Sequence, residues 1–220
     1  MRFAALETST EWCSVALFRD GEIACVERRA ANRHSELALP MLQRLLREAH
    51  LAADRLDAVA FGAGPGSFTG LRIACGIAQG LAFAHGLPVL GVSTLEALAE
   101  ESGAPRVLAC LDARMGEVYY AALEKRGGRW HEALPAQCVA PSLLAIPQGD
   151  WVGAGNGFAV YGNLGLKRTL PQVHPTAIAI ARLAAPRLAA GEGVDAALAA
   201  PLYVREKVAL TKAELDERRP

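Results

Sequence analysis

Apolar residues along this chain alternate between short runs typical of buried strands and longer stretches with the 3.6-residue spacing of helices. Three strands open the chain, and the last two are joined by a hairpin turn centred on Asp20-Gly21. Helical spacing then runs over residues 35–49, and a short apolar run predicts a further buried strand at 58–61. The three opening strands are predicted at residues 3–6, 13–18 and 23–28.

A glycine-rich turn follows that fourth strand and leads into a second helix, predicted over residues 68–84. Residues 62–72 read GAGPGSFTGLR, and Ser67 is a good N-cap because its hydroxyl accepts from a free amide of the first turn. Amides that converge at a helix N-terminus also attract anions. The glycine spacing fits neither a P-loop nor a dinucleotide motif, so a purely structural turn is the alternative. The candidate residues of an anion or nucleotide turn are Thr8, Ser9, Gly64, Gly66 and Ser67.

The rest of the chain completes this first unit and then repeats a similar order of predicted elements in a second unit. A strand at 88–92, a helix at 94–100 capped by Ser93 or Thr94, and a boundary near residue 104 complete a first unit. The second unit has strands at 107–111, 117–124 and 129–139, a strand with a glycine turn at 151–157, an Ala-rich helix at 177–190 interrupted by Pro186, and an extended piece at 201–205.

Two similar lobes predict an α/β chain with a two-lobed, actin-like (ribonuclease H-like) architecture whose second lobe is truncated. The predicted domains are residues 1–103, residues 104–205 and a charged tail at 206–220 that is frayed or disordered. In such folds a nucleotide normally lies between the lobes. This expectation keeps an actin-like small-molecule kinase among the alternatives.

Composition narrows the function. The chain is 52% apolar with zero net charge, which argues against strong stand-alone binding to nucleic acid. A local basic patch near the first helix keeps a tRNA-binding module as an alternative, although a solvated face is the simpler interpretation. No apolar run is long enough to span a bilayer, no secretory signal opens the chain, and the five scattered cysteines fit a reducing cytoplasm. The basic patch comprises Arg28, Arg29, Arg33, Arg44 and Arg47.

Glycines in the second predicted helix suggest close contact with another element. Gly70, Gly76 and Gly80 each destabilise a helix by up to about 1 kcal/mol relative to alanine. Close approach of a helix or sheet, from this chain or a partner, would offset that loss. In the first helix Leu39 lies off the main apolar stripe, which indicates a second apolar face.

Several motifs together resemble the TsaB (YeaZ) family over nearly the whole chain. They are LETST at 6–10 with SVAL at 14–17, RHSE at 33–36, GPGSFTGLR at 64–72 and PLYVR at 201–205. The resemblance implies an actin-like fold and a cytoplasmic partner of TsaD, the subunit that transfers a threonylcarbamoyl group to adenosine 37 of tRNA. The ATPase TsaE joins that complex, and tRNA is expected to bind only through it.

The same resemblance implies that this chain is not itself a catalyst. Relatives of TsaD carry a metal-binding His-x-x-x-His, and the corresponding positions here are Thr94 and Leu98. The TsaD catalytic Asp corresponds to Glu11. Neither a hydroxyl nor an isobutyl group replaces imidazole as a ligand, so we expect no metal and no cofactor. A peptidase of the M22, glycoprotease-like type remains the second enzyme alternative.

A docking face is the function that remains. The resemblance implies that the first two helices contact TsaD, or a second copy when the chain is alone. The predicted interface residues are Arg33, His34, Leu37, Met41, Leu45, Arg72, Ala74, Gly76, Ile77 and Gly80.

Overall fold

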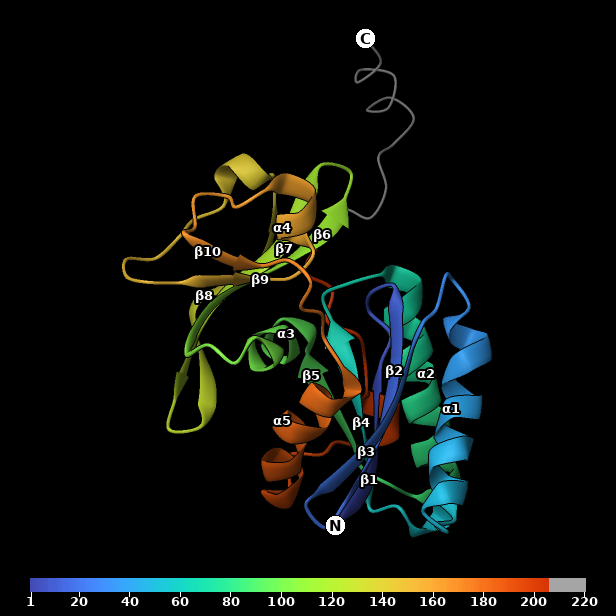
Figure 1. The fold of residues 1–220 in the computed structure, drawn as a ribbon. Helices are drawn as coiled ribbons and strands as arrows, with labels where there is room; N and C mark the ends of the chain where they lie inside the picture. Colours follow the sequence, from blue (N-terminus) through green and yellow to red (C-terminus); the bar gives the residue numbers. More distant parts are fainter. Residues whose placement is uncertain (206–220) are drawn as a thin grey trace.

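The computed structural model describes residues 1–205, so the tail predicted at 206–220 lies outside the described residues. Two five-stranded sheets form two lobes (Figure 1). The first sheet has the order β3-β2-β1-β4-β5, with β1 antiparallel to β2 and parallel to β4. The predicted opening meander is therefore confirmed. The strands are β1 (Arg2–Glu7), β2 (Trp12–Arg19), β3 (Glu22–Arg29), β4 (Ala58–Gly64) and β5 (Val89–Ser93).

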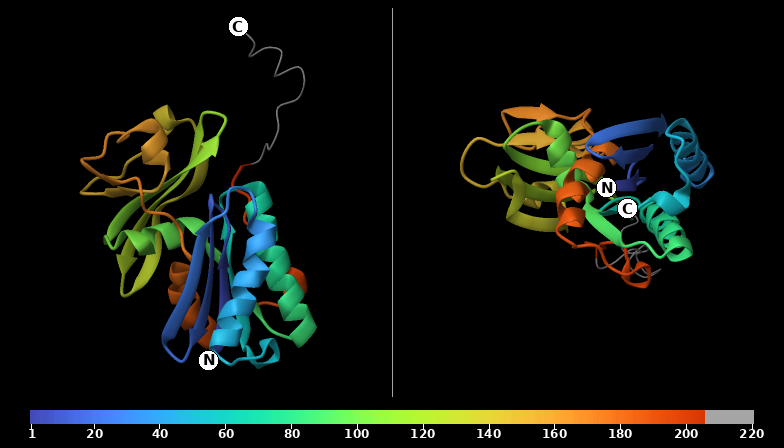
Figure 2. Two further views of the ribbon diagram at one scale, coloured as in Figure 1. Left: turned by 45° about the vertical axis from the view of Figure 1, so that its right-hand side comes forward. Right: turned by 90° about the horizontal axis from the view of Figure 1, so that it is seen from below.

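Alternating side chains of the first sheet form two cores, because neighbouring residues of a strand point to opposite faces. Ala4 and Leu6 pack under α1 (His34–Glu48) and α2 (Phe68–His85). Phe3 and Ala5 pack under α5 (Ala177–Ala189). Figure 2 shows α1 and α2 together on one side of this sheet and α5 on the other.

The second sheet repeats the connectivity of the first. Its order is β10-β9-β6-β7-β8, with β6 antiparallel to β7 and parallel to β9. The helix complement of this lobe is small, since α4 (Gly157–Tyr161) is short. This pattern is the predicted two-lobed actin-like fold with a truncated second lobe. The strands are β6 (Arg106–Arg114), β7 (Glu117–Arg126), β8 (Arg129–Val139), β9 (Val152–Ala154) and β10 (Arg168–Leu170).

Two helices connect the lobes. α3 (Thr94–Ser102) has Ser93, one of the two predicted caps, as its N-cap, and its Leu95 and Leu98 pack against the second sheet. α5 comes late in the chain, yet it packs on the first sheet. Residue 104 lies between the last strand of the first sheet and the first strand of the second, whereas α5, which follows the second sheet, lies against the first lobe.

The predicted interruption at Pro186 is wrong, because α5 continues through it to Ala189. Ala177 to Ala184 are already fixed by burial against the first sheet, so one missing amide bond near the end does not stop the helix. The described residues contain no helix that is both long and apolar enough to cross a membrane.

Candidate partner-binding face and interlobe cleft

The glycine turn fits tightly against the turn between β1 and β2. Ser67 caps α2, as predicted, by accepting from the Gly70 amide at 3.4 Å. Its own amide donates to the Ser9 carbonyl at 2.7 Å. The Thr8 hydroxyl donates to the Gly70 carbonyl, also at 2.7 Å. The two turns therefore use several of their polar groups on one another.

Glycine is required at this contact. A Cβ on Gly66 would lie 2.6 Å from the Cβ of Ser9, and one on Gly70 would overlap the Thr8 carbonyl. The structure thus brings together the candidate anion residues Thr8, Ser9, Gly66 and Ser67, and Gly64 ends the preceding strand. Their mutual contacts favour the structural interpretation of the turn.

A cleft of about 510 Å³ lies beside this turn. The first lobe lines it with the β1–β2 turn and the start of α2, and the second lobe with residues 111–114 and Tyr119. Its wall carries charges of both signs: Glu11 and Asp112 are acidic, whereas Arg114 and Arg205 are basic. Asp112 is already within 3.5 Å of Arg114.

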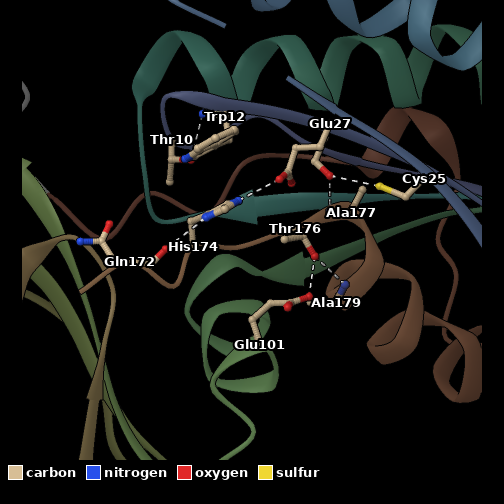
Figure 3. A network of polar contacts seen from close by, with 11 residues as sticks. Thr10, Trp12, Cys25, Glu27, Glu101, Gln172, His174, Thr176, Ala177 and Ala179 are labelled. Atoms are coloured by element: carbon tan, nitrogen blue, oxygen red, sulfur yellow. Dashed lines mark hydrogen bonds and ion pairs between the residues drawn. The ribbon is translucent and has the colours of Figure 1, made fainter. Parts of the chain in front are cut away.

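The lobes are also joined by a polar network where the chain passes from β10 to α5 (Figure 3). The His174 Nε2 lies 3.1 Å from Glu27 Oε1, and the His174 ring stacks on Trp12. This hydrogen bond is the largest cause that raises the pKa of His174 and lowers the pKa of Glu27. Two residues further on, the Thr176 hydroxyl donates to Glu101 at 2.6 Å.

The positions at which the family resemblance places the catalytic groups of TsaD lie apart. Thr94 and Leu98 are fully buried in α3, whereas Glu11 lies at the cleft. Burial raises the pKa of Glu7, which is fully enclosed at the end of β1. Within residues 1–205, no three His, Cys, Asp or Glu side chains are grouped to hold a metal ion.

The predicted interface residues divide into three groups by exposure. Met41, Leu45 and Ala74 are buried in this chain's own core, so in the isolated chain they offer no exposed surface to a partner. The helical spacing identified an apolar stripe, and that stripe faces the sheet. His34 is buried as well, with its Nε2 donating to the Thr10 carbonyl at 2.9 Å.

The remaining predicted residues reach the surface. Leu37 and Ile77 are half-buried, and Arg33, Arg72, Gly76 and Gly80 are exposed. In particular, Gly76 and Gly80 have open space in front of them: in the described part of the chain, nothing lies within 4 Å of a Cβ built on either.

Sequence reasoning missed Phe83, which is 85% exposed near the end of α2. An apolar residue off the buried stripe of Ala74, Ala78 and Ala82 was the signal that could have identified it. It also missed a cluster in which Arg72 lies over the Phe68 ring and donates to the Tyr203 hydroxyl at 3.0 Å.

The five arginines of the proposed basic patch are all exposed. One of them, Arg44, pairs with Glu48 at 2.7 Å one helical turn away. This neutralised pair is typical of a solvated helix surface.

Comparisons with known proteins give matches over most of the chain. A family model described as "TsaD: tRNA N6-adenosine threonylcarbamoyltransferase" matches residues 25–211. The chain is 38% identical to the tRNA threonylcarbamoyladenosine biosynthesis protein TsaB of Escherichia coli, over 96% of this chain and 98% of that protein. The TsaB of Haemophilus influenzae is 35% identical over 94% and 95% of the two chains.

A solved structure is similar to this chain in both sequence and fold. The YeaZ structure from Pseudomonas aeruginosa superposes with a TM-score of 0.87 at 41% identity and covers 92% of this chain and 99% of that one. Because both sequence and fold match over nearly their full lengths, this chain belongs to the TsaB (YeaZ) family.

Proposed function

We propose that this chain is a non-catalytic, cytoplasmic subunit in the synthesis of N6-threonylcarbamoyladenosine at position 37 of bacterial tRNA. In this role it pairs with a TsaD homologue through the outer face of α1 and α2 and supports threonylcarbamoyl transfer together with TsaE. The printed names of its relatives support the pathway, since they are tRNA threonylcarbamoyladenosine biosynthesis proteins.

The outer face of α2 carries the proposal. Gly76 and Gly80 are four residues apart on one exposed side of the helix, and among residues 1–205 nothing packs against them. Two glycines in a helix interior destabilise it by up to about 2 kcal/mol relative to alanines. Gly70 in the same helix has a reason within the chain, its contact with Thr8. Close packing by a helix of another subunit gives Gly76 and Gly80 an equivalent reason.

Neighbouring residues extend this face with apolar surface. Phe83 follows one turn after Gly80, and Ile77 is half-buried between the two glycines. On the adjacent α1, Leu39 is 42% exposed next to Pro40. An exposed face of small and large apolar residues is typical of a helix-packing interface.

A non-catalytic role is supported by the two residues of this chain that stand where the resemblance places the metal ligands of TsaD. Thr94 and Leu98 are buried side chains of α3, and neither provides a nitrogen ligand for a metal. The kinase alternative predicts tight binding of ATP with Mg²⁺ in the cleft. Titration calorimetry on the isolated chain tests it, and we expect no tight binding because the glycine turn already uses its polar groups internally.

The Gly76→Leu variant tests the docking face. An isobutyl group at this open position leaves room for the chain to fold but prevents close approach of a partner helix. We expect loss of co-purification with the TsaD homologue of the same genome, with an unchanged circular dichroism spectrum. Ala189→Leu is the matched control, because it places the same leucine side chain on the exposed side of α5 across the sheet. Undiminished pairing by Gly76→Leu would place the interface elsewhere.

Activity of the assembled system tests the pathway. We expect TsaD, TsaE and threonylcarbamoyl-adenylate to modify tRNA with this chain present and to lose most activity when it is omitted or replaced by Gly76→Leu. Salt-dependent retention of tRNA by this chain alone would instead support the tRNA-binding alternative.

A further inference from the structure

The PLYVR motif at residues 201–205 has no part in the docking face proposed above, yet it touches both lobes. We propose that these residues, called the strap below, fasten the two lobes to one another across the mouth of the cleft. The proposal rests on contacts within this chain and does not depend on the proposed function.

The strap is bound to the first lobe through its backbone. The Leu202 amide donates to the Ala63 carbonyl at 2.7 Å, at the end of β4. The Leu202 carbonyl lies against Gly64, where a Cβ would come within 2.7 Å of that oxygen. Gly64 also has a φ of +122°, so both its conformation and this contact require glycine.

The next side chain adds a second attachment to the first lobe. The Tyr203 hydroxyl accepts from Arg72 Nε at 3.0 Å, and the Tyr203 ring lies 5.8 Å from that of Phe68. The Arg72 guanidinium lies 3.7 Å from the centre of the Phe68 ring, a cation–π distance. Leu202 is therefore held at the end of β4, and Tyr203 at the start of α2.

Arg205 provides the attachment to the second lobe. Its side chain is only 14% exposed, and Nη2 lies 2.5 Å from Glu117 Oε2. The same nitrogen donates to the Arg114 carbonyl at 3.3 Å, and the guanidinium lies 5.7 Å from the Tyr119 ring. These partners all belong to the β6–β7 hairpin or the strands beside it.

The strap is a third connection between the lobes. It matters because the other two connections, where the chain crosses from one lobe to the other, lie next to each other. The chain crosses between lobes before β6 and again after β10, and the hydrogen bond from Thr176 to Glu101 joins these crossovers (Figure 3). Adjacent crossovers form a hinge, about which lobes can rotate. A tie at the cleft, away from that axis, is what removes this freedom.

The strap takes a role that a ligand has in other hinged proteins. Domain closure around a ligand depends on contacts from that ligand to both sides. Here Leu202, Tyr203 and Arg205 line the cleft and make such contacts themselves. The lobes are thus held at one angle without a bound molecule.

Residual dipolar couplings of backbone amides in the full-length chain test this proposal, because they report the relative orientation of two lobes. In the unchanged chain we expect one alignment tensor to fit both sheets. In Arg205→Ala we expect each sheet to fit well by itself, with the second requiring its own tensor of smaller magnitude. Arg187→Ala is the matched control, since Arg187 pairs with Glu192 at 2.9 Å within the first lobe.

Reversing the charges of the Arg205–Glu117 pair tests whether the fixed orientation of the lobes can be restored. Arg205→Glu should release the second lobe, and Arg205→Glu with Glu117→Arg should restore a single tensor. If Arg205→Ala prevents folding, shown by a poor fit of each sheet alone, Glu117→Gln removes the opposite charge and decides the same question. One shared tensor in a folded Arg205→Ala or Glu117→Gln variant would overturn the proposal.

Discussion

His174 connects the two lobes through a contact that depends on its protonation. Its ring stacks on Trp12 with centroids 4.6 Å apart, and its Nε2 lies 3.1 Å from Glu27. The pKa of His174 is raised above 6.5, chiefly by the hydrogen bond to Glu27, and Glu101 adds to this rise. The pKa of Glu27 is lowered from 4.5 by the same hydrogen bond.

The sign of both shifts predicts a window of maximal stabilisation. Because the pKa of His174 is raised, its protonated form stabilises the fold fully below pH 6.5. This stabilisation is lost as the pH rises through the folded-state pKa. Because the pKa of Glu27 is lowered, its carboxylate stabilises the fold above pH 4.5. This stabilisation is lost as the pH falls through the folded-state pKa of Glu27. The pair therefore contributes most between these values.

His174→Gln tests this window. We expect the free energy of unfolding in urea to fall by about 1 kcal/mol at about pH 6, as for a partly buried ion pair, and by less at about pH 9. An equal loss at both pH values would show that stacking on Trp12, rather than charge, stabilises this contact.

At the scale of one element, α2 contains glycines with opposite roles. Gly70 is buried, and a Cβ there would overlap the Thr8 carbonyl, whereas Gly76 has open space. We expect Gly70→Ala to destabilise the chain by about 2 kcal/mol or more, in the range of overpacked sites. Gly76→Ala should instead stabilise it by up to about 1 kcal/mol through helix propensity. Thermal unfolding measures both, and similar effects of the two substitutions would contradict the assignment.

Local periodicity explains which elements were predictable. The meander β1–β3, the cap at Ser67 and both long helices follow from patterns within one segment. β10 was not predicted, because its residues Arg168–Leu170 are too few to show alternation. The burial of Met41 and Ala74 was missed for a different reason: spacing identifies an apolar stripe but does not tell whether a sheet or a partner covers it.

At the scale of the molecule, distant segments meet in ways that no local pattern specifies. α5 lies on the first sheet although the whole of the second sheet precedes it in the chain, and Tyr203 reaches Arg72 across 131 positions. The echo of strand order between the lobes was nevertheless visible in the sequence. The sequence pattern did not show that the chain returns to the first sheet after the second sheet is complete.

Self-association is the prediction that belongs to the whole molecule. If the isolated chain forms a homodimer through the outer face of α2, Phe83 becomes buried, and a side chain of this size contributes about 1.5–3 kcal/mol on burial. We expect Phe83→Ser to raise the dimer dissociation constant at least about tenfold, which corresponds to about 1.4 kcal/mol, by sedimentation equilibrium. Because the side chain is 85% exposed, the stability of the monomer should change little.

Leu143→Ser is the matched control, since Leu143 is 71% exposed on the second lobe, away from α2. It should leave the dissociation constant unchanged. A TsaD homologue that uses the same face should dissociate the homodimer of the unchanged chain as it is titrated in, because one surface cannot hold two partners at once. A homodimer that persists in a ternary assembly with TsaD, or one weakened by Leu143→Ser but not by Phe83→Ser, would assign self-association to a different face.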